Sequence, residues 1–240
     1  MARGEFVICK DLDSVAEKAA EFFIASGRKA IGERGRFNVV LSGGSTPKLM
    51  FGKLAAAIAD NPLPLDEIYF FFGDERMVPV TSEESNFRMA NELLLSPLSI
   101  PEQNIFRFRT ELEPDAAAAD YSRRVRGHFG LESGFPSFDL VFLGLGTDGH
   151  TASLFPGTDV LNEQEKIAAS VFVPKFDSHR LTLTLPVLNS AAAVAFLVTG
   201  ADKRDVLCKV REGDSSLPAE KINPAGDLIW FVDEAAAGQP

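Results

Sequence analysis

Residues 138–156 read FDLVFLGLGTDGHTASLFP, an apolar run followed by a turn that contains three glycines. The apolar run is typical of a buried strand, and the glycines let the backbone turn sharply and approach a ligand closely. The turn also holds Asp148 and His150, a carboxylate and an imidazole two residues apart. Ligands bind at the carboxyl ends of strands in open α/β sheets, so this turn is a candidate site of proton transfer.

A second glycine-rich turn follows the apolar run FNVVL at residues 37–41. The pattern predicts a strand, a loop and then a helix over residues 47–58, with Thr46 as N-cap and Pro47 as the first helical residue. Free backbone N–H groups at such a helix start, together with nearby hydroxyls, favour a phosphate or a carboxylate. The loop lacks the spacing of a Walker A motif and of a dinucleotide fingerprint. The candidate anion-binding residues are Gly43, Gly44, Ser45 and Thr46.

A third turn comes after the apolar run IYFFF at residues 68–72, where the chain continues as Gly-Asp-Glu-Arg. We expect these charges at the same sheet edge as the other two turns. Arg76 is suited to hold a phosphate or a carboxylate with two hydrogen bonds. The neighbouring carboxylates, Asp74 or Glu75, are candidates to accept sugar hydroxyls or to orient Arg76.

Alternating strand and helix patterns predict one α/β domain over residues 1–240, with a mainly parallel sheet and helices on both faces. No linker or internal repeat divides the chain. The expected strands cover 5–9, 37–41, 68–72, 139–143, 168–173, 181–185, 194–198 and 228–231. The expected helices cover 14–32, 47–58, 84–95, 115–129 and 202–211.

The amino-acid composition and the net charge argue against several classes of function. The net charge of -10 argues against binding to nucleic acid or to an anionic membrane, and no stretch is long and apolar enough to span a bilayer. Cys9 and Cys208 form neither a disulfide framework nor a zinc spacing, so we expect a reducing, cytoplasmic location, no metal and no cofactor. No apolar seam is evident, and a monomer is expected. His128, in a charged helix end, is expected to be solvated, and His179 to lie outside the site.

Four ordered segments together resemble the 6-phosphogluconolactonase family, and the likeness covers most of the chain. They are SGGSTP at 42–47, GDER at 73–76 with Val78-Pro79 and Ser85-Asn86 downstream, the turn at 144–156, and HRLTLTLP at 179–186 followed by FLVTGADK at 196–203. The resemblance implies a fold similar to those of glucosamine-6-phosphate deaminases and ribose-5-phosphate isomerases.

The family activity is hydrolysis of 6-phospho-D-glucono-1,5-lactone to 6-phospho-D-gluconate in the oxidative pentose phosphate pathway. The resemblance therefore makes His150 the base that activates water, with Asp148 orienting its ring. It also adds Arg180 and Lys203 to Arg76 and the glycine loop as substrate anchors. Which anchor binds the phosphate and which the carbonyl is open at this stage.

Three alternatives are weighed against this interpretation. Glucosamine-6-phosphate deaminases share the glycine loop, but they carry an acidic residue where this chain continues as Ser153-Leu154-Phe155-Pro156, and Asp-Glu-Tyr where it has Asp74-Glu75-Arg76. A non-catalytic sugar-phosphate sensor would normally carry an added DNA-binding segment. The third and minor alternative is covalent catalysis by Ser153. As a separate expectation, residues 79–85 are a candidate lid over the site.

Overall fold

A computed structural model describes residues 4–238 of the chain, so the ends of the predicted domain, 1–3 and 239–240, lie outside the described residues. Its centre is a seven-stranded sheet in which every neighbouring pair is parallel. This confirms the predicted single α/β domain with a mainly parallel sheet. In spatial order the strands are β1 (Glu5–Cys9), β10 (Asp227–Asp233), β9 (Ala193–Val198), β6 (Leu140–Gly144), β2 (Phe37–Leu41), β3 (Ile68–Phe72) and β5 (Ile105–Phe106).

The direction of strand addition reverses between β2 and β6. The chain places β2, β3 and β5 in one direction across the sheet, and then returns to place β6, β9 and β10 on the other side of β2. Such a reversal leaves a crevice outside the carboxyl ends of the two central strands, and ligands bind there in open α/β sheets. The glycine loop after β2 and the His150 turn after β6 both lie at this point.

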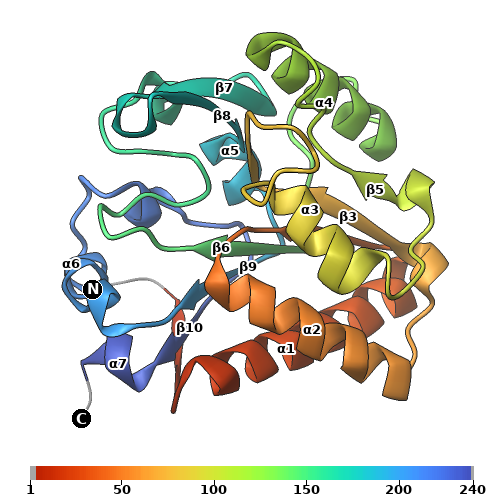
Figure 1. Cartoon of the computed structure of the whole chain (residues 1–240), viewed down its shortest axis with the longest axis horizontal. Helices are drawn as coiled ribbons and strands as arrows, with labels where there is room; N and C mark the ends of the chain where they lie inside the picture. The colour runs from red at the N-terminus through yellow and green to blue at the C-terminus, as the bar shows by residue number, and fades with distance from the viewer. Residues whose placement is uncertain (1–3, 239–240) are drawn as a thin grey trace.

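Helices cover both faces of the large sheet (Figure 1). Helices α1 (Leu12–Arg34) and α2 (Ser45–Asp60) lie side by side on one face, and α4 (Pro114–Phe129) lies on the other. Asp11 caps α1 by accepting a hydrogen bond from the Ser14 N–H at 2.9 Å. The shorter helices are α3 (Asn86–Ala90), α5 (Leu185–Asn189), α6 (Arg204–Glu212) and α7 (Glu234–Ala237). Among residues 4–238, no helix has the length and apolar character needed to cross a membrane.

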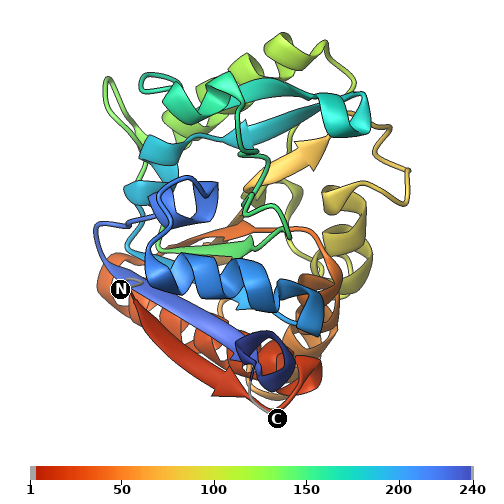
Figure 2. The same cartoon turned by 90° about the vertical axis from the view of Figure 1, so that its left-hand side faces the viewer.

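A second, antiparallel sheet lies over the large one on the side opposite α1 and α2 (Figure 2). It consists of β4 (Asp74–Arg76), β8 (Ser178–Leu183) and β7 (Ala168–Val173). The strands predicted at 168–173 and 181–185 therefore exist but do not join the parallel sheet. Only residues 174–177 connect them, and a parallel pair would need a crossover of a dozen residues or more.

Helix α2 begins two residues earlier than the sequence predicts, at Ser45, with Gly44 rather than Thr46 in the N-cap position. Gly44 has a φ of 111°, a conformation that side-chain-bearing residues rarely adopt, and this turns the chain into the helix. The Thr46 hydroxyl instead lies 2.8 Å from the Thr199 hydroxyl at the end of β9. The predicted N-cap role of Thr46 is therefore wrong, although the residue still lies at the mouth of the loop.

Other boundaries shift by a few residues. The helix predicted over 84–95 is α3, capped by Ser85, followed by a π-helical turn over Asn91–Leu95. The helix predicted over 202–211 starts as a 3-10 turn at Ala201–Lys203 before α6 begins. The remaining 3-10 turns cover Leu65–Glu67, Glu102–Asn104, Asp159–Asn162, Pro174–Phe176 and Pro218–Lys221.

His128, near the end of α4, is not the solvated charge that the sequence predicts. Its Nε2 lies 2.7 Å from the Asn38 side-chain oxygen, and its ring centroid is 4.5 Å from that of Tyr69. Burial among aromatic rings, helped by the nearby charge of Arg36, lowers the pKa of His128 to about 4. The imidazole is therefore neutral at physiological pH, and its Nε2–H donates to the Asn38 oxygen.

The buried neutral histidine predicts how stability depends on pH. The unfolded ring binds a proton near pH 6.5 and the folded ring only near pH 4, so the unfolded state binds more protons between these values. The free energy of unfolding should therefore fall as the pH is lowered from 6.5 to 4. Urea unfolding of His128→Gln over this range should show a shallower pH slope than wild type. His179→Gln is the matched control. Equal pH slopes for His128→Gln and wild type would contradict the assignment of His128 as a neutral imidazole.

Candidate active site

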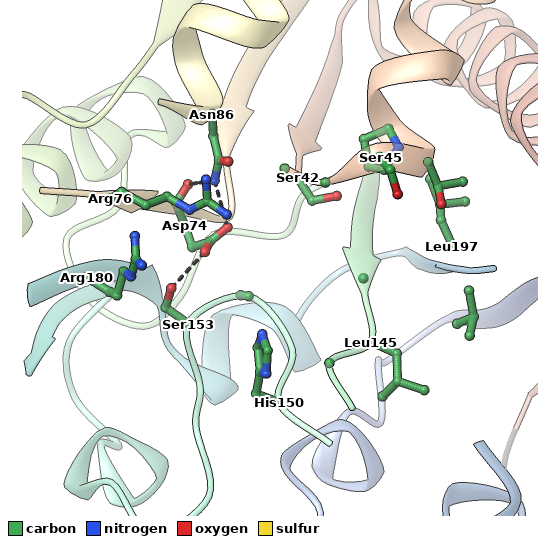
Figure 3. Close-up of a pocket in the computed structure, with 18 of the residues that line it drawn as sticks. Ser42, Ser45, Asp74, Arg76, Asn86, Leu145, His150, Ser153, Arg180 and Leu197 are labelled. Carbon is green, nitrogen blue, oxygen red and sulfur yellow. Dashed lines mark hydrogen bonds between the residues drawn. The ribbon is translucent and has the colours of Figure 1, made fainter. Parts of the chain in front are cut away.

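A cleft of about 380 Å³ opens at the carboxyl ends of β2, β3, β6 and β9 (Figure 3). It brings together the three turns that the sequence singles out, together with β8 of the small sheet. All of the predicted site residues except Asp148 line it. These are Gly43, Gly44, Ser45, Thr46, Asp74, Arg76, His150, Arg180 and Lys203.

Asp148 does not line the cleft, but it makes two hydrogen bonds with His150. The Asp148 Oδ1 atom is hydrogen-bonded to Nδ1 of the His150 ring and accepts the His150 backbone N–H at 3.2 Å. Burial would raise the pKa of Asp148, but the hydrogen bonds and charge of His150, with a contribution from Lys175, lower it to about 2. Because an ionised carboxylate only accepts hydrogen bonds, Nδ1 carries the proton. The other ring nitrogen, Nε2, is then free to accept a proton from a ligand.

Two neighbours hold the His150 ring in place. The Phe155 ring is stacked on it, with 4.2 Å between the centroids and 26° between the planes. Gly146 adjoins the ring closely, because a β-carbon built on it would lie 2.0 Å from Nδ1. The glycines of this turn therefore provide room for the imidazole as well as a bend in the chain.

Gly146→Ala should displace the His150 ring and lower kcat by about tenfold or more for any reaction in which that ring transfers a proton, because a small misplacement of a reacting group is costly. The φ angle of Gly146 is not positive, so alanine is not strained in the left-handed region, and the three atoms nearest to its β-carbon would all belong to the His150 ring. Steady-state kinetics test this, with Gly52→Ala in α2 as the control, since nothing lies within 4 Å of a β-carbon there. Equal kcat values for Gly146→Ala and wild type would show that the ring tolerates the extra methyl group.

Two arginines lie next to each other on adjacent strands of the small sheet. Arg76 of β4 pairs in register with Arg180 of β8. Arg76 donates to the Glu84 carbonyl at 2.6 Å, and the Arg180 guanidinium lies 5.1 Å from the centroid of the Phe176 ring. Burial and the charge of Arg76 lower the pKa of Arg180. Within residues 4–238, neither guanidinium forms an ion pair, although the carboxylates of Asp74, Glu84 and Glu75 are near enough to act on the charge of Arg180.

Asp74 joins the turn after β6 to the loop after β3. Its Oδ2 accepts the Ser153 hydroxyl at 2.7 Å, and its Oδ1 accepts the Asn86 amide at 3.2 Å (Figure 3). The Ser153 hydroxyl thus donates to a carboxylate rather than to His150. This arrangement gives no support to covalent catalysis by Ser153, which would need His150 as its base.

Glu75 does not line the cleft, so the alternative in which it accepts sugar hydroxyls is wrong. It is only 2% exposed and accepts the backbone N–H groups of Arg76, Asn86 and Phe87 at 2.8–2.9 Å, and the Ser85 hydroxyl at 3.1 Å. Burial raises the pKa of Glu75. Its carboxylate fixes the backbone on which Arg76 is mounted.

Asn86 lines the cleft and is absent from the residues that the sequence predicts as binding residues. Its side-chain oxygen lies against the glycine loop, because a β-carbon on Gly43 would be 1.9 Å from it. The sequence carries a signal for it, since Asn86 lies near the start of the helix predicted over 84–95, a few residues after the turn that holds Arg76. Its role depends on a contact with a loop more than 40 residues earlier, which no local pattern reveals.

The glycine loop and Lys203 form a second polar part of the cleft. The Ser42 hydroxyl is buried and has no hydrogen-bond partner. Lys203 lies 3.1 Å from Asp202 and lines the same cleft. In Figure 3, Ser45 lies on one side of His150 and the two arginines on the other. The cleft therefore presents two anion-favouring regions with an imidazole between them.

Other candidate groups lie outside the cleft. His179 is exposed, and its ring packs against that of Phe172 with 5.2 Å between the centroids. In the described part of the chain, no three His, Cys, Asp or Glu residues are grouped as a metal site.

Known proteins resemble this chain over most of its length. The family described as "Glucosamine-6-phosphate isomerases/6-phosphogluconolactonase" matches residues 10–230. A 6-phosphogluconolactonase from Synechocystis is 43% identical over 87% of this chain and 86% of its own, and one from Homo sapiens is 44% identical over 86% and 81%. The crystal structure of 6-phosphogluconolactonase from Thermotoga maritima has a TM-score of 0.84 and 31% identity, covering 96% of this chain and all of its own. The chain therefore belongs to the family of glucosamine-6-phosphate isomerases and 6-phosphogluconolactonases.

Proposed function

We propose that this protein is a carboxylic ester hydrolase that converts 6-phospho-D-glucono-1,5-lactone to 6-phospho-D-gluconate, in the oxidative pentose phosphate pathway. The observation that carries the proposal is the His150 ring, oriented by Asp148 and placed between two anion-favouring regions of one cleft. The names of the relatives from Synechocystis and Homo sapiens support the same substrate.

In the proposed mechanism His150 acts as a general base and then as a general acid. Nε2 takes a proton from a water molecule as the water oxygen attacks the lactone carbonyl carbon. The carbonyl oxygen becomes negative in the tetrahedral intermediate. The bond to the ring oxygen then breaks, and Nε2 returns its proton to that oxygen. Asp148 stabilises the imidazolium that exists between these steps, and the product acid ionises in water.

We assign the substrate phosphate to the glycine loop and Lys203. The N-terminus of α2 provides backbone N–H groups, the unpartnered Ser42 hydroxyl is a spare donor, and Lys203 supplies a charge. We assign Arg76 and Arg180 to the lactone end, where negative charge develops on the carbonyl oxygen during the reaction. Asp74, already engaged by Ser153 and Asn86, then accepts a substrate hydroxyl or holds the wall of the cleft.

The rival activity in the same family is deamination of glucosamine 6-phosphate. Arg76, paired in register with Arg180, favours the lactonase, because the deaminases carry a tyrosine at that place. The segment Ser153-Leu154-Phe155-Pro156 favours it too, because it lacks the acidic residue that the deaminases carry there. Each substrate should be offered separately to the protein. We expect fast acid release from freshly prepared phosphogluconolactone and no ammonia release from glucosamine 6-phosphate, and the reverse result would contradict the proposal.

We further propose that the protein works as a monomer in the cytoplasm, without nucleic acid or membrane partners. The acidic balance of -10 supports the absence of nucleic-acid partners. Analytical ultracentrifugation at micromolar concentration should give a single species near 26.0 kDa.

A further inference from the structure

The turn between β7 and β8 contacts two charged groups assigned to the reaction, the Asp148 carboxylate and the Arg180 guanidinium. This turn covers residues 174–177, and Asp177 closes it in a left-handed conformation with a φ of 45°. The Lys175 ammonium lies 3.2 Å from Asp148 Oδ2. The next residue, Phe176, packs at 5.8 Å from Phe155 and at 5.1 Å from the Arg180 guanidinium.

The Asp148 carboxylate is therefore shared between two nitrogen donors, with the His150 ring on Oδ1 and Lys175 on Oδ2. No other ion-pair partner of Asp148 occurs within residues 4–238. A substitution at Lys175 leaves the other charged groups of the cleft wall unchanged. These groups are Asp74, Arg76, Glu84, Arg180 and Lys203. The charge of Lys175 offsets part of the negative charge that Asp148 presents to the ring, and so disfavours the imidazolium.

We propose that Lys175 is a positioning residue for the His150–Asp148 pair. It holds Oδ2, so that Oδ1 stays directed at Nδ1, and it extends to lower pH the range in which the ring is neutral and can act as a base. This inference rests on the proposed hydrolysis, in which His150 takes a proton from water. It deepens that proposal by giving the β7–β8 turn a part in the reaction.

The test compares wild type, Lys175→Met and Lys175→Arg, with Lys166→Met as a control that also removes one positive charge, from a lysine paired with Glu163. The ring proton signals of the three histidines are followed by NMR over pH, and His150→Ala identifies the His150 signal. The side chain of Lys175 is 58% exposed, so the substitutions are expected to leave the fold intact. A Tm close to that of wild type checks this.

In Lys175→Met we expect the titration midpoint of His150 to rise by about half a pH unit, since the lost charge is close but screened by water. The acidic limb of kcat/KM should move by the same amount, which lowers the rate there by roughly threefold. Lys175→Arg and Lys166→Met should match wild type.

An unchanged His150 midpoint in Lys175→Met would overturn the inference, and so would a shift of equal size in Lys166→Met. Failure of the proposed function is a distinct result, because wild type would then give no lactone hydrolysis at any pH. The ring titration would still report whether Lys175 acts on the His150–Asp148 pair.

Discussion

Replacing His150 with alanine should lower kcat for phosphogluconolactone hydrolysis by roughly a hundredfold or more, because the water then loses its general base. KM should change less, because the proposed anchors for the phosphate are in the glycine loop and at Lys203. The ring fills space between Phe155 and Gly146, so the variant should remain folded while leaving a small gap in the cleft wall.

The measurement is steady-state kinetics on freshly prepared lactone, with the uncatalysed rate subtracted. His179→Ala is the matched control, since His179 is exposed and does not line the cleft. If His150→Ala kept a wild-type kcat, the base would have to be another group and the mechanism proposed for the His150–Asp148 pair would be wrong. Loss of rate in His179→Ala alone would lead to the same conclusion.

Arg180→Met should lower kcat by about a hundredfold, with a smaller change in KM. The reason is that removing one donor to a developing oxyanion costs mainly transition-state stabilisation. Arg180 sits in register with Arg76, and neither guanidinium is ion-paired in the described part of the chain, so the pair is free to meet charge that appears during the reaction. Methionine is an unbranched side chain that removes the charge, and with it the contact of the guanidinium with the Phe176 ring.

Lys203→Met supplies the contrasting variant. Because we assign Lys203 to the phosphate, which keeps its charge throughout the reaction, its loss should raise KM more than it lowers kcat. Arg123→Met is the control, since Arg123 is highly exposed and pairs with Asp120 on α4. The opposite split, with KM raised by Arg180→Met and kcat lowered by Lys203→Met, would exchange the two assignments.

Local patterns in the sequence predict six of the seven strands of the central sheet, because each of the six is a short apolar run between turn residues. The seventh, β5, is missed because it has only two residues, both partly exposed. FNVVL and LVFLG become β2 and β6, buried at the centre of the sheet. Patterns of the same kind do not say which sheet a strand joins. The strand over 168–173 forms an antiparallel pair because residues 174–177 leave no room for a crossover, and β4 is too short to show a period.

The candidate site, like the fold, is predicted from the sequence only in part. The three turns are visible because glycines, hydroxyls and charges follow apolar runs, and the order of the strands brings their ends together. The burial of Glu75, the contact of Asn86 with Gly43 and the pairing of Lys175 with Asp148 depend on segments that are distant in sequence or on side-chain direction. The prediction of a solvated His128 is wrong because its neighbours in the sequence are charged, whereas its neighbours in space are aromatic rings.

The proposed function requires that this cleft hydrolyses a phosphorylated lactone. The most direct measurement is the rate of acid release from freshly generated 6-phospho-D-glucono-1,5-lactone with folded wild-type protein, after subtraction of the spontaneous rate. We predict a large acceleration that saturates with substrate and is lost in His150→Ala. No acceleration by wild-type protein, with its fold confirmed by circular dichroism, would contradict the account.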